Sequence, residues 1–320
     1  MKAQDSGPRA IGIVLGDPNG VGPEIALRAA CALPAGARLR PVLIGDAYVI
    51  ERCAAGLGLP ADARSRYDIE DVAALPFAAW RPGAVDARAG EATVAYVRAA
   101  VAMCRAGRVA AIAAGPHSET AINAAGIPFS GYGGLVADLT GAERERVFLM
   151  LAACGLRVVH ATLHERLADA LARLTPQRVV DAALAGHATM RRLGIDRPRG
   201  CLLGINPHAG ENGLFGDDDE RVGRPAADLL ARAGVLVEGP IGADLALAER
   251  RHDFHVAMFH DQGHIAVKML SPKGAVALVA GAPILFASVG HGAAFDIAGQ
   301  GRADASALTD TLQLLGEAAA

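Results

Sequence analysis

The sequence predicts an α/β protein in which strands and helices alternate along the chain. Several short apolar runs end in polar or glycine-rich turns, and stretches rich in alanine and leucine follow them, as in βα units. Of the 320 residues, 52% are apolar and only 4% aromatic, so aliphatic side chains must fill the core. Length and composition together indicate one large or two medium domains.

Charge and cysteine content restrict the expected partners and compartment. The net charge is -3 and no basic run occurs, which gives no reason to expect nucleic acid or an anionic membrane surface as a partner. The five cysteines are scattered and never form CxxC, as is typical of reduced residues. No apolar run reaches the ~18 residues of a membrane span, and the first residues lack an apolar signal region. We therefore expect a cytoplasmic protein.

The first predicted unit of the chain is a strand, Ile11 to Leu15, which a glycine-rich turn joins to a helix. The turn reads GDPNGVGPE over residues 16–24, and the helix covers residues 25–33. The turn is not GxGxxG and lacks the lysine of a phosphate-binding P-loop. Neither nucleotide-binding fingerprint applies to it.

Further elements follow in alternating order. Residues 147–151 and 156–160 are typical of an antiparallel pair of strands. Residues 175–193 predict a helix, because Thr175 can cap it and Pro176 occupies its first position. The remaining expected elements are strands over 41–45, 109–114, 201–205, 275–280 and 284–289, an irregular connection over 57–89, and helices over 90–105, 224–233, after 244 and after 304.

The stretch MFHDQGHIAVK, residues 258–268, predicts a site at the end of a buried strand. An imidazole beside a carboxylate, His260 and Asp261, suits metal ligation or proton transfer. Lys268 is one of three lysines in the chain and lies among apolar residues, where it needs an anionic partner. The alternative is a surface lysine whose stem covers apolar surface beside a structural histidine.

Three histidines share one sequence context: His164, His208 and His260 each lie where a predicted strand gives way to a loop. If these strand ends converge, the three imidazoles can hold a divalent ion, with Asp244 or Asp261 completing the shell. A chain with ten histidines will also place three at strand ends by chance. His160 precedes His164 by four residues, but the valines before it favour a strand, so we expect only one of the two at a site.

His117 follows the predicted strand over 109–114, at the kind of strand end where α/β sheets hold ligands. It can equally be a histidine near the N-cap of a helix.

The order of several motifs resembles that of the 4-hydroxythreonine-4-phosphate dehydrogenase family. The motifs are GDPxGxGPE, NPHAGE, HDQG followed by a lysine, and SVxHGxAxxxAGxG, and they run in the same order from about Ile11 to Leu315. The last loop, HGAAFDIAGQGRAD, also resembles the NAD loop of isopropylmalate and isocitrate dehydrogenases. The resemblance implies a two-domain α/β fold of that type, with the active site in a cleft between the domains.

The resemblance also implies boundaries and an assembly. We expect residues 1–125 and 275–320 to form a first domain with the NAD loop. Residues 126–274 form the second, which carries the metal site and the interface of a homodimer.

Roles for individual residues follow from the same resemblance. The divalent metal, zinc first and cobalt, nickel, manganese or iron as alternatives, is expected on the three histidines, one of which comes from the partner subunit. Lys268 is expected to hold the anionic end of the substrate, with Asp244 and Asp261 beside the metal as catalytic residues. The remaining expected residues are His117, Tyr132, Gly133, Ala277 and Phe286 for substrate, and Gly290, His291, Gly292, Asp296, Gly299 and Gly301 for NAD.

The sequence departs from the family pattern where that pattern holds a phosphate. The family's GHTE reads Gly131-Tyr132-Gly133-Gly134, and Glu119 replaces a lysine. Ala277 and Phe286 replace an asparagine and an arginine. Each lost charge-assisted contact costs a phosphate roughly 1.5–3 kcal/mol. A phosphorylated substrate is therefore disfavoured.

These departures, with PHxETAI, FSGY and HDQGHI, resemble one branch of the family, the 1,2-dihydroxy-3,5-cyclohexadiene-1,4-dicarboxylate dehydrogenases. That branch oxidises the cis-dihydrodiol of terephthalate with NAD and decarboxylates it to protocatechuate. Tyr132 and Phe286 could line a pocket for the flat ring, or simply fill space. The alternatives are a 4-hydroxythreonine-4-phosphate or sugar-acid phosphate dehydrogenase, and a non-catalytic relative that binds metal or ligand.

Overall fold

Parallel strands form the sheet of the first of two units in a computed structural model that describes residues 9–34, 39–272 and 274–317. This unit comprises Met1–Leu135 and Ile284–Ala320, and the second comprises Val136–Pro283. In the first unit, neighbouring strands all pair in parallel, in the order β3-β2-β1-β4-β11. These strands are β1 (Arg9–Val14), β2 (Leu39–Gly45), β3 (Asp68–Asp71), β4 (Ala111–Ala114) and β11 (Phe286–Val289).

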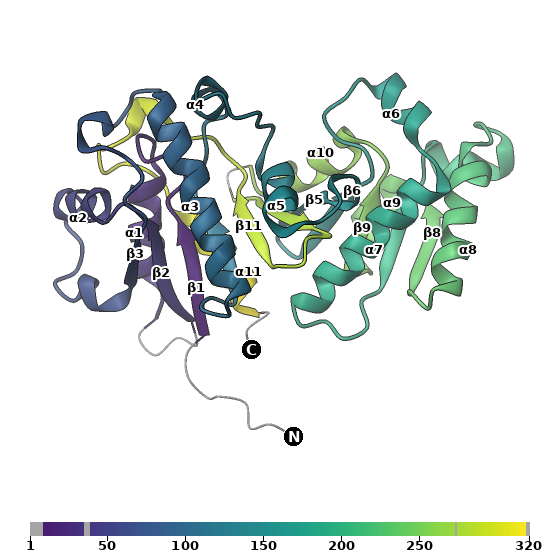
Figure 1. Cartoon of the computed structure of the whole chain (residues 1–320). Coiled ribbons are helices and arrows are strands. Elements are labelled where there is room, and N and C mark those ends of the chain that lie inside the picture. The colour runs from purple at the N-terminus through teal and green to yellow at the C-terminus, as the bar shows by residue number, and fades with distance from the viewer. Residues whose placement is uncertain (1–8, 35–38, 273, 318–320) are drawn as a thin grey trace. The chain divides into compact units, whose positions relative to one another are not determined.

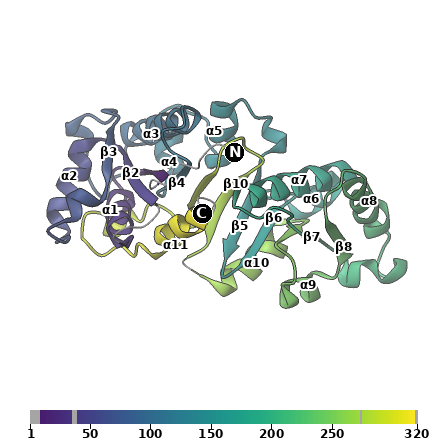
Figure 2. The same cartoon turned by 90° about the horizontal axis from the view of Figure 1, so that it is seen from below.

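Helices cover both faces of this sheet (Figures 1 and 2). One face is covered by α3, which packs on β1, β2 and β4, and the other by α1 and α11. A parallel sheet covered on both faces needs strands whose buried stretch is apolar throughout, as residues 11–14 of β1 and all of β4 are. The helices are α1 (Gly22–Ala32), α2 (Ala47–Gly56), α3 (Ala87–Arg105), α4 (Glu119–Ala124) and α11 (Ser306–Glu317), and α5 (Tyr132–Thr140) leads into the second unit.

The second unit has a mixed sheet in the order β10-β5-β6-β9-β7-β8. β5 pairs antiparallel with both β10 and β6, whereas β6, β9, β7 and β8 run parallel to one another. The strands are β5 (Phe148–Ala153), β6 (Leu156–His160), β7 (Gly200–Leu203), β8 (Val237–Ile241), β9 (Phe254–Ala257) and β10 (Val276–Ala280). The helices are α6 (Leu167–Arg173), α7 (Pro176–Arg192), α8 (Arg224–Arg232), α9 (Ala243–Glu249) and α10 (His260–Leu270).

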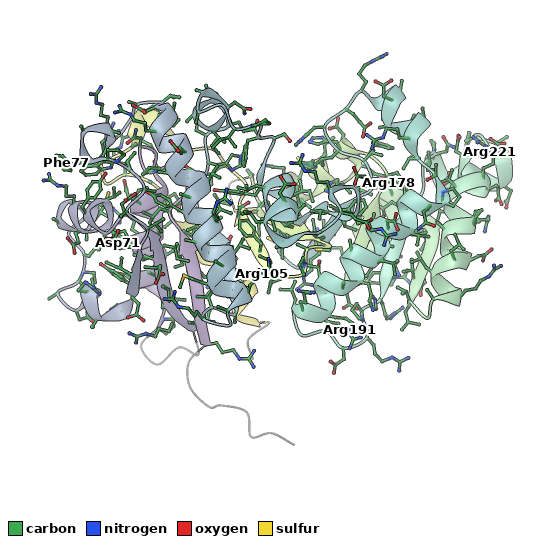
Figure 3. The ribbon with its side chains drawn as sticks, in the orientation of Figure 1. Asp71, Phe77, Arg105, Arg178, Arg191 and Arg221 are labelled. Carbon is green, nitrogen blue, oxygen red and sulfur yellow. The ribbon has the colours of Figure 1, made fainter. Side chains whose placement is uncertain are left out.

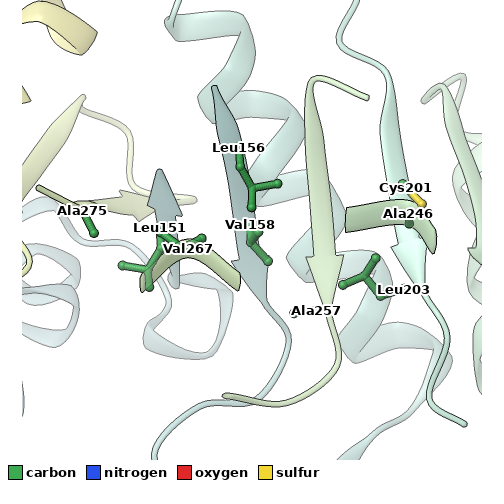
Figure 4. Close-up of a cluster of buried hydrophobic side chains, with 9 residues drawn as sticks. All are labelled: Leu151, Leu156, Val158, Cys201, Leu203, Ala246, Ala257, Val267 and Ala275. Carbon is green, nitrogen blue, oxygen red and sulfur yellow. The ribbon is translucent and has the colours of Figure 1, made fainter. Parts of the chain in front are cut away.

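One apolar cluster fixes α9 and α10 on the sheet of the second unit (Figure 4). Ala246 is the member of this cluster from α9, and Val267 is the member from α10. Because both helices bury these side chains, the position of α10 over β5 and β6 is set by apolar packing. The other members of the cluster are Leu151, Leu156, Val158, Cys201, Leu203, Ala257 and Ala275.

Most of the expected elements are confirmed. The fold is a mixed α/β fold, and β5 and β6 form the expected antiparallel pair. The side chain of Thr175 caps α7 by accepting a hydrogen bond from the backbone N–H of Arg178 at 3.1 Å, and Pro176 is its first residue. All five cysteines lie in the described residues, and none of them forms a disulfide there. No helix in the described residues is long and apolar enough to cross a membrane.

Two expectations were wrong. The connection over 57–89 contains a strand, β3, that pairs with β2 despite its sequence Asp-Ile-Glu-Asp. Its charge is tolerated because β3 is an edge strand and Arg40 forms an ion pair with Asp68. The motif HDQGH does not extend the preceding strand: β9 ends at Ala257, and His260 is the first residue of α10.

Candidate active site

Four histidines gather at one edge of the sheet in the second unit. β6 and β9 are parallel neighbours, with His160 opposite Ala257, so the residues that follow their carboxyl ends lie close together. His160 ends β6, and His164 follows in the next loop. His260 and His264 lie one turn apart on α10, and their rings stack with centroids 3.7 Å apart. The centroid distances are 4.6 Å between His160 and His264 and 5.5 Å between His164 and His260.

A chain of hydrogen bonds fixes the tautomers of two of these rings. Nδ1 of the buried His160 lies 3.2 Å from the carbonyl oxygen of Leu149, and a carbonyl only accepts, so this nitrogen donates. The Nε2 of His160 is then the acceptor for Nδ1 of His264, 3.1 Å away. The Nε2 of His264 therefore carries a lone pair.

Both rings of this chain are neutral near pH 7. Burial, and then the nearby His264, lowers the pKa of His160 to about 3. Burial, and then the nearby His260, lowers the pKa of His264 to about 4. Gly263 allows this approach, because a Cβ there would lie 2.4 Å from Nε2 of His160.

The first turn of α10 is tied to two strand ends. Gln262 accepts a hydrogen bond from the N–H of Met258 at 2.7 Å and donates to the carbonyl of Gly204 at 2.7 Å. His260 donates from Nδ1 to the carboxylate of Asp261 at 2.7 Å, so that in the neutral form of the ring Nε2 carries the lone pair. This arrangement, an imidazole backed by a carboxylate, is what a metal-binding histidine requires.

The loop that carries His164 is held from two sides. The hydroxyl of Thr162 donates to the carbonyl of Met258 at 2.7 Å. Arg178 on α7 (Figure 3) donates to the carbonyl of Ala161 at 2.7 Å, and its guanidinium lies 4.4 Å from the ring centroid of Phe148. His164 itself is exposed, so the loop presents its ring to solvent.

A cavity of about 430 Å³ adjoins the two solvent-facing histidines of this cluster. It combines polar groups with an apolar wall, as small-molecule sites do. Its lining comprises Leu163, His164, Glu165, Leu167, Ala170, Phe259, His260 and Asp261.

His208 lies apart from these rings. It belongs to a segment, Pro207–Gly213, in which His208 to Asn212 all have left-handed backbone angles. Its side chain is 66% exposed and lies 3.9 Å from the carboxylate of Glu211. A Cβ on Gly242 would lie 3.5 Å from Cα of His208 and 3.0 Å from the carboxylate of Asp244, so Asp244 and His208 flank Gly242.

The structure thus brings together two of the three predicted metal ligands, His164 and His260. Across the described part of the chain, no group of three or more histidine, cysteine or acidic residues is arranged to hold a metal ion. The predicted three-histidine metal site stays a prediction.

Lys268 lies two turns beyond His260 on α10. It is partly exposed, and its charge helps to lower the pKa of His264 after the effects of burial and His260. The predicted substrate residue Ala277 lies on β10, half-buried against the apolar cluster, and offers only a methyl group.

In the first unit, three predicted substrate residues belong to a cluster of rings. The ring of His117 lies 4.5 Å from that of Tyr132 and 4.9 Å from that of Phe129, and the rings of Tyr132 and Phe286 are 5.3 Å apart. Burial lowers the pKa of His117, although Glu119, at 3.8 Å, opposes the shift. His117 and Phe129 lie between β4 and α5, whereas Tyr132 is the first residue of α5 and Phe286 is the first residue of β11.

The cluster has a buried side and an accessible side. Phe286 is fully buried and Tyr132 nearly so, and the Tyr132 hydroxyl donates to the carbonyl of Gly115 at 2.9 Å. Their predicted contact with substrate stays a prediction. His117 and Phe129 are the partly exposed members, and Gly133, in the first turn of α5, is also partly exposed.

The predicted NAD segment is the loop that follows β11. Gly290 and His291 begin it, Gly292 is exposed, and a short 3-10 turn over Phe295–Ile297 contains Asp296. Gly299 and Gly301 have φ of 72° and 67°, which glycine adopts without strain. The loop lies at the carboxyl end of a parallel sheet, where α/β proteins bind ligands.

Several residues in these places were missed from the sequence. His264 is part of the quoted motif, and its spacing of four from His260 would have paired the two rings if the segment had been read as a helix. Both His160 and His164 join the cluster, although only one was expected. In the first unit, Asp17 is buried with its Oδ2 unpaired among the described residues, and burial raises its pKa to about 6.

Comparisons of the sequence place these features among known proteins. The family model for the pyridoxal phosphate biosynthetic protein PdxA matches residues 37–315. The 1,2-dihydroxy-3,5-cyclohexadiene-1,4-dicarboxylate dehydrogenase of a Comamonas species is 45% identical over 308 residues, covering 96% of this chain and 97% of that protein. The D-threonate 4-phosphate dehydrogenase of Cupriavidus necator is 39% identical, covering 95% of each chain.

The solved structures that are similar to this chain include the same kinds of dehydrogenase. A terephthalate 1,2-cis-dihydrodiol dehydrogenase from Burkholderia xenovorans is 48% identical, with a TM-score of 0.75 over 97% of this chain and 98% of that one. A 4-hydroxythreonine-4-phosphate dehydrogenase from Burkholderia phymatum is 36% identical, with a TM-score of 0.86 over 97% and 98% of the two chains. The chain is therefore similar over nearly its whole length to dehydrogenases that act on CH–OH groups.

Proposed function

The chain belongs to the family of the pyridoxal phosphate biosynthetic protein PdxA, and from that premise we propose that it oxidises and decarboxylates a cis-dihydrodiol dicarboxylate. The proposed substrate is the cis-dihydrodiol of terephthalate, the hydride acceptor is NAD, and the product is protocatechuate. Similarity to relatives that act on this diol supports the substrate class.

The observation that carries the choice of substrate is the loss of positive and polar groups where the family pattern holds a phosphate. Ala277 presents a methyl group and Phe286 a buried ring, and the exposed Glu119 adds a negative charge. A phosphate dianion would gain no charge-assisted contact from these three side chains. A carboxylate carries one negative charge, against about −1.5 to −2 for a phosphate ester at pH 7, so each anionic end of a dicarboxylate needs fewer such contacts.

The reaction follows from the position of the groups on the diol. Hydride leaves the ring carbon that bears the secondary hydroxyl and passes to NAD, while the hydroxyl proton passes to a base. The new carbonyl is β to a carboxylate, so the bond to that carboxylate breaks and carbon dioxide leaves. Its electron pair forms an enolate, which with the two double bonds of the ring is the aromatic catecholate, and the enolate oxygen takes up a proton to give the catechol.

We assign the roles in this reaction to side chains of the second unit. Lys268 holds the carboxylate that stays on the ring, and Asp244 and Asp261 are the candidates for taking the hydroxyl proton and for returning a proton to the oxygen of the product. His164, His208 and His260 would hold a divalent ion, which, when bound, polarises the hydroxyl and stabilises the enolate. In the first unit, the loop from Gly290 to Gly301 would hold NAD.

A homodimer in which one chain completes the metal site of the other is part of the proposal. The separation of His208 from the other rings favours it, because a partner subunit can supply the missing ligand. Mixing the inactive variants H208A and H260A tests this. If these ligands come from different chains, one site in four is complete, so about a quarter of the activity returns.

The decisive experiment measures NADH formation by the purified, metal-loaded protein. The cis-dihydrodiol of terephthalate and 4-phosphohydroxy-threonine are supplied in parallel, each with and without EDTA, and carbon dioxide release is followed. We expect turnover of the diol alone, with carbon dioxide equal to NADH, and its loss with EDTA. Turnover of the phosphate ester alone would reject the proposal.

A second candidate is a D-threonate 4-phosphate dehydrogenase, favoured by the 39% identity to such an enzyme over 95% of each chain. D-Threonate 4-phosphate therefore belongs in the same assay. A chain that binds NAD and metal but turns over none of the three substrates would revive the alternative of a non-catalytic relative.

A further inference from the structure

We propose that Glu24 and Arg28 on α1 are positioning residues that anchor the end of the loop over residues 290–304 and thereby set the affinity for NAD. The proposal rests on the proposed function, in which this loop binds the cofactor. It assigns a role to the GDPNGVGPE turn over residues 16–24, which has no role in the reaction described above. The turn and α1 lie beside the loop in Figure 2.

The start of the loop is fixed by the backbone of the turn. The N–H of Val21 donates to the carbonyl of Ala293 at 2.9 Å. A Cβ on Gly20 would lie 2.7 Å from the same carbonyl oxygen, so only glycine permits this approach. The contact leaves Gly292, the residue before Ala293, exposed.

The end of the loop is fixed by two side chains. The carboxylate of Glu24 accepts a hydrogen bond from the N–H of Ala303 at 2.9 Å. The guanidinium of Arg28 donates to the carbonyl of Gly301 at 2.9 Å, and it also donates to Glu24 at 3.4 Å. Glu24 and Arg28 are four residues apart, so they lie on one face of α1 and act on the loop together.

Burial of Glu24 stabilises its hydrogen bond with the end of the loop. The Glu24 side chain is 3% exposed, and its Oε2 has no hydrogen-bond partner among the described residues. A buried carboxylate cannot exchange its protein partners for water, so losing the contact with Ala303 leaves the charge poorly satisfied. The anchored geometry is therefore favoured before any ligand binds.

The middle of the loop packs against the segment around Pro82. A Cβ on Gly299 would lie 3.1 Å from Cβ of Pro82, and a Cβ on Gly83 would lie 3.1 Å from the carbonyl of Phe295. Asp296 and Gly299 remain exposed between the two anchors. A loop held in this way loses less conformational entropy on binding NAD than a free one.

The test compares R28A, R28K and E24A with the wild type in the full-length protein. Hydrogen–deuterium exchange of residues 290–304 without ligand reports the anchoring alone. Calorimetric titration with NAD and steady-state kinetics measure how the anchoring changes the affinity for NAD. We expect faster exchange in R28A and E24A, a Kd and KM for NAD raised roughly tenfold, and kcat nearly unchanged. R28K keeps a donor and should recover part of the loss.

R66A is the matched control. Arg66 donates to the carbonyl of Cys31 on the same helix at 2.8 Å, and its side chain is 32% exposed against 35% for Arg28, but it does not touch the loop. It should leave both exchange and NAD binding as in the wild type. If R66A weakens NAD binding as much as R28A does, the effect is general loosening and the proposal is overturned.

The two remaining outcomes separate this proposal from the proposed function. Faster exchange with unchanged Kd for NAD overturns the role in affinity. A wild-type chain that binds no NAD at all rejects the proposed function, and with it the link from anchoring to cofactor affinity. E24A creates a buried cavity, and if this variant does not fold, the variants of the partly exposed Arg28 decide.

Discussion

The rings of His260 and His264 stack nearly parallel, with an angle of 16° between their planes. His264 is in turn held by its hydrogen bond to the buried His160, which is fixed by the carbonyl of Leu149. The orientation of a surface histidine at the cavity is thus set by a chain of contacts that ends in β5. His260 is a proposed metal ligand, so in the proposed site His264 and His160 would orient this ligand without contacting the metal themselves.

We predict that breaking this chain weakens metal binding and turnover. H264L removes both the stacked ring and the donor to His160, and should lower metal affinity and kcat/KM roughly 10- to 100-fold, as loss of an outer-shell partner does. H264F keeps a ring to stack on His260 and should lose less. Metal affinity is measured by competition with a chelating dye, and kcat/KM from NADH formation. Wild-type metal affinity in H264L would contradict the prediction.

A second prediction concerns Lys268. K268M keeps the apolar stem and removes the charge, so the substrate carboxylate loses a charge-assisted contact of about 1.5–3 kcal/mol. The kcat/KM for the diol should fall about 10- to 100-fold, measured as the initial rate of NADH formation. Its exposed neighbour on α10 provides the control, because M269A should leave the rate unchanged. Equal rates for K268M and wild type would show that this lysine does not hold substrate.

Local sequence signals correctly predicted those elements whose own residues mark where they begin or end, such as a capping residue or an apolar run. Thr175 and Pro176 define the start of α7 within two residues, and apolar runs of four to six residues mark the core strands. The start of α10 has no such signal. Its N-cap is Phe259, which makes no side-chain cap hydrogen bond, and Gln262 ties the helix instead to Met258 and Gly204.

The histidine cluster depends on pairing between distant segments. His160 and His264 are 104 residues apart in sequence and meet because β6 and β9 are neighbours in the sheet. Strand order is set by the packing of the whole unit, so no local pattern reveals it. The same reasoning explains why Phe129 was not foreseen as a neighbour of His117: only the folded turn between α4 and α5 brings the rings together.

A third prediction concerns a buried polar pair in the first unit. The hydroxyl of the fully buried Tyr96 donates to the carboxylate of Asp46, which also accepts from the N–H of Leu75 at 3.1 Å. Y96F leaves a buried carboxylate with one partner fewer and should lower the free energy of unfolding by about 1–3 kcal/mol, measured by urea denaturation. Y48F, which removes a half-buried bond to the carbonyl of Leu75, is the control and should cost less. A larger loss in Y48F would contradict this ranking.

A fourth prediction concerns stability at acid pH and His255. This residue lies on β9 and is fully buried, and neither ring nitrogen makes a well-formed hydrogen bond among the described residues, although the backbones of Arg157 and Ala246 lie close enough to favour the protonated ring slightly. Burial, and then the nearby His252, lowers its pKa from 6.5 to about 4. Between these values the unfolded chain binds a proton that the folded chain does not. The contribution of neutral His255 is therefore complete above pH 6.5 and is lost as the pH falls toward 4.

The variant H255L tests how much the protonation of His255 contributes to the pH dependence of stability. It should unfold at nearly the wild-type free energy at pH 7, because an unpaired buried imidazole adds little, but its stability should fall less steeply on acidification. The difference in slope should be about 1.4 kcal/mol per pH unit below pH 6.5, measured by urea denaturation at three pH values. Identical slopes for H255L and wild type would mean that His255 is already protonated, or hydrated, in the folded chain.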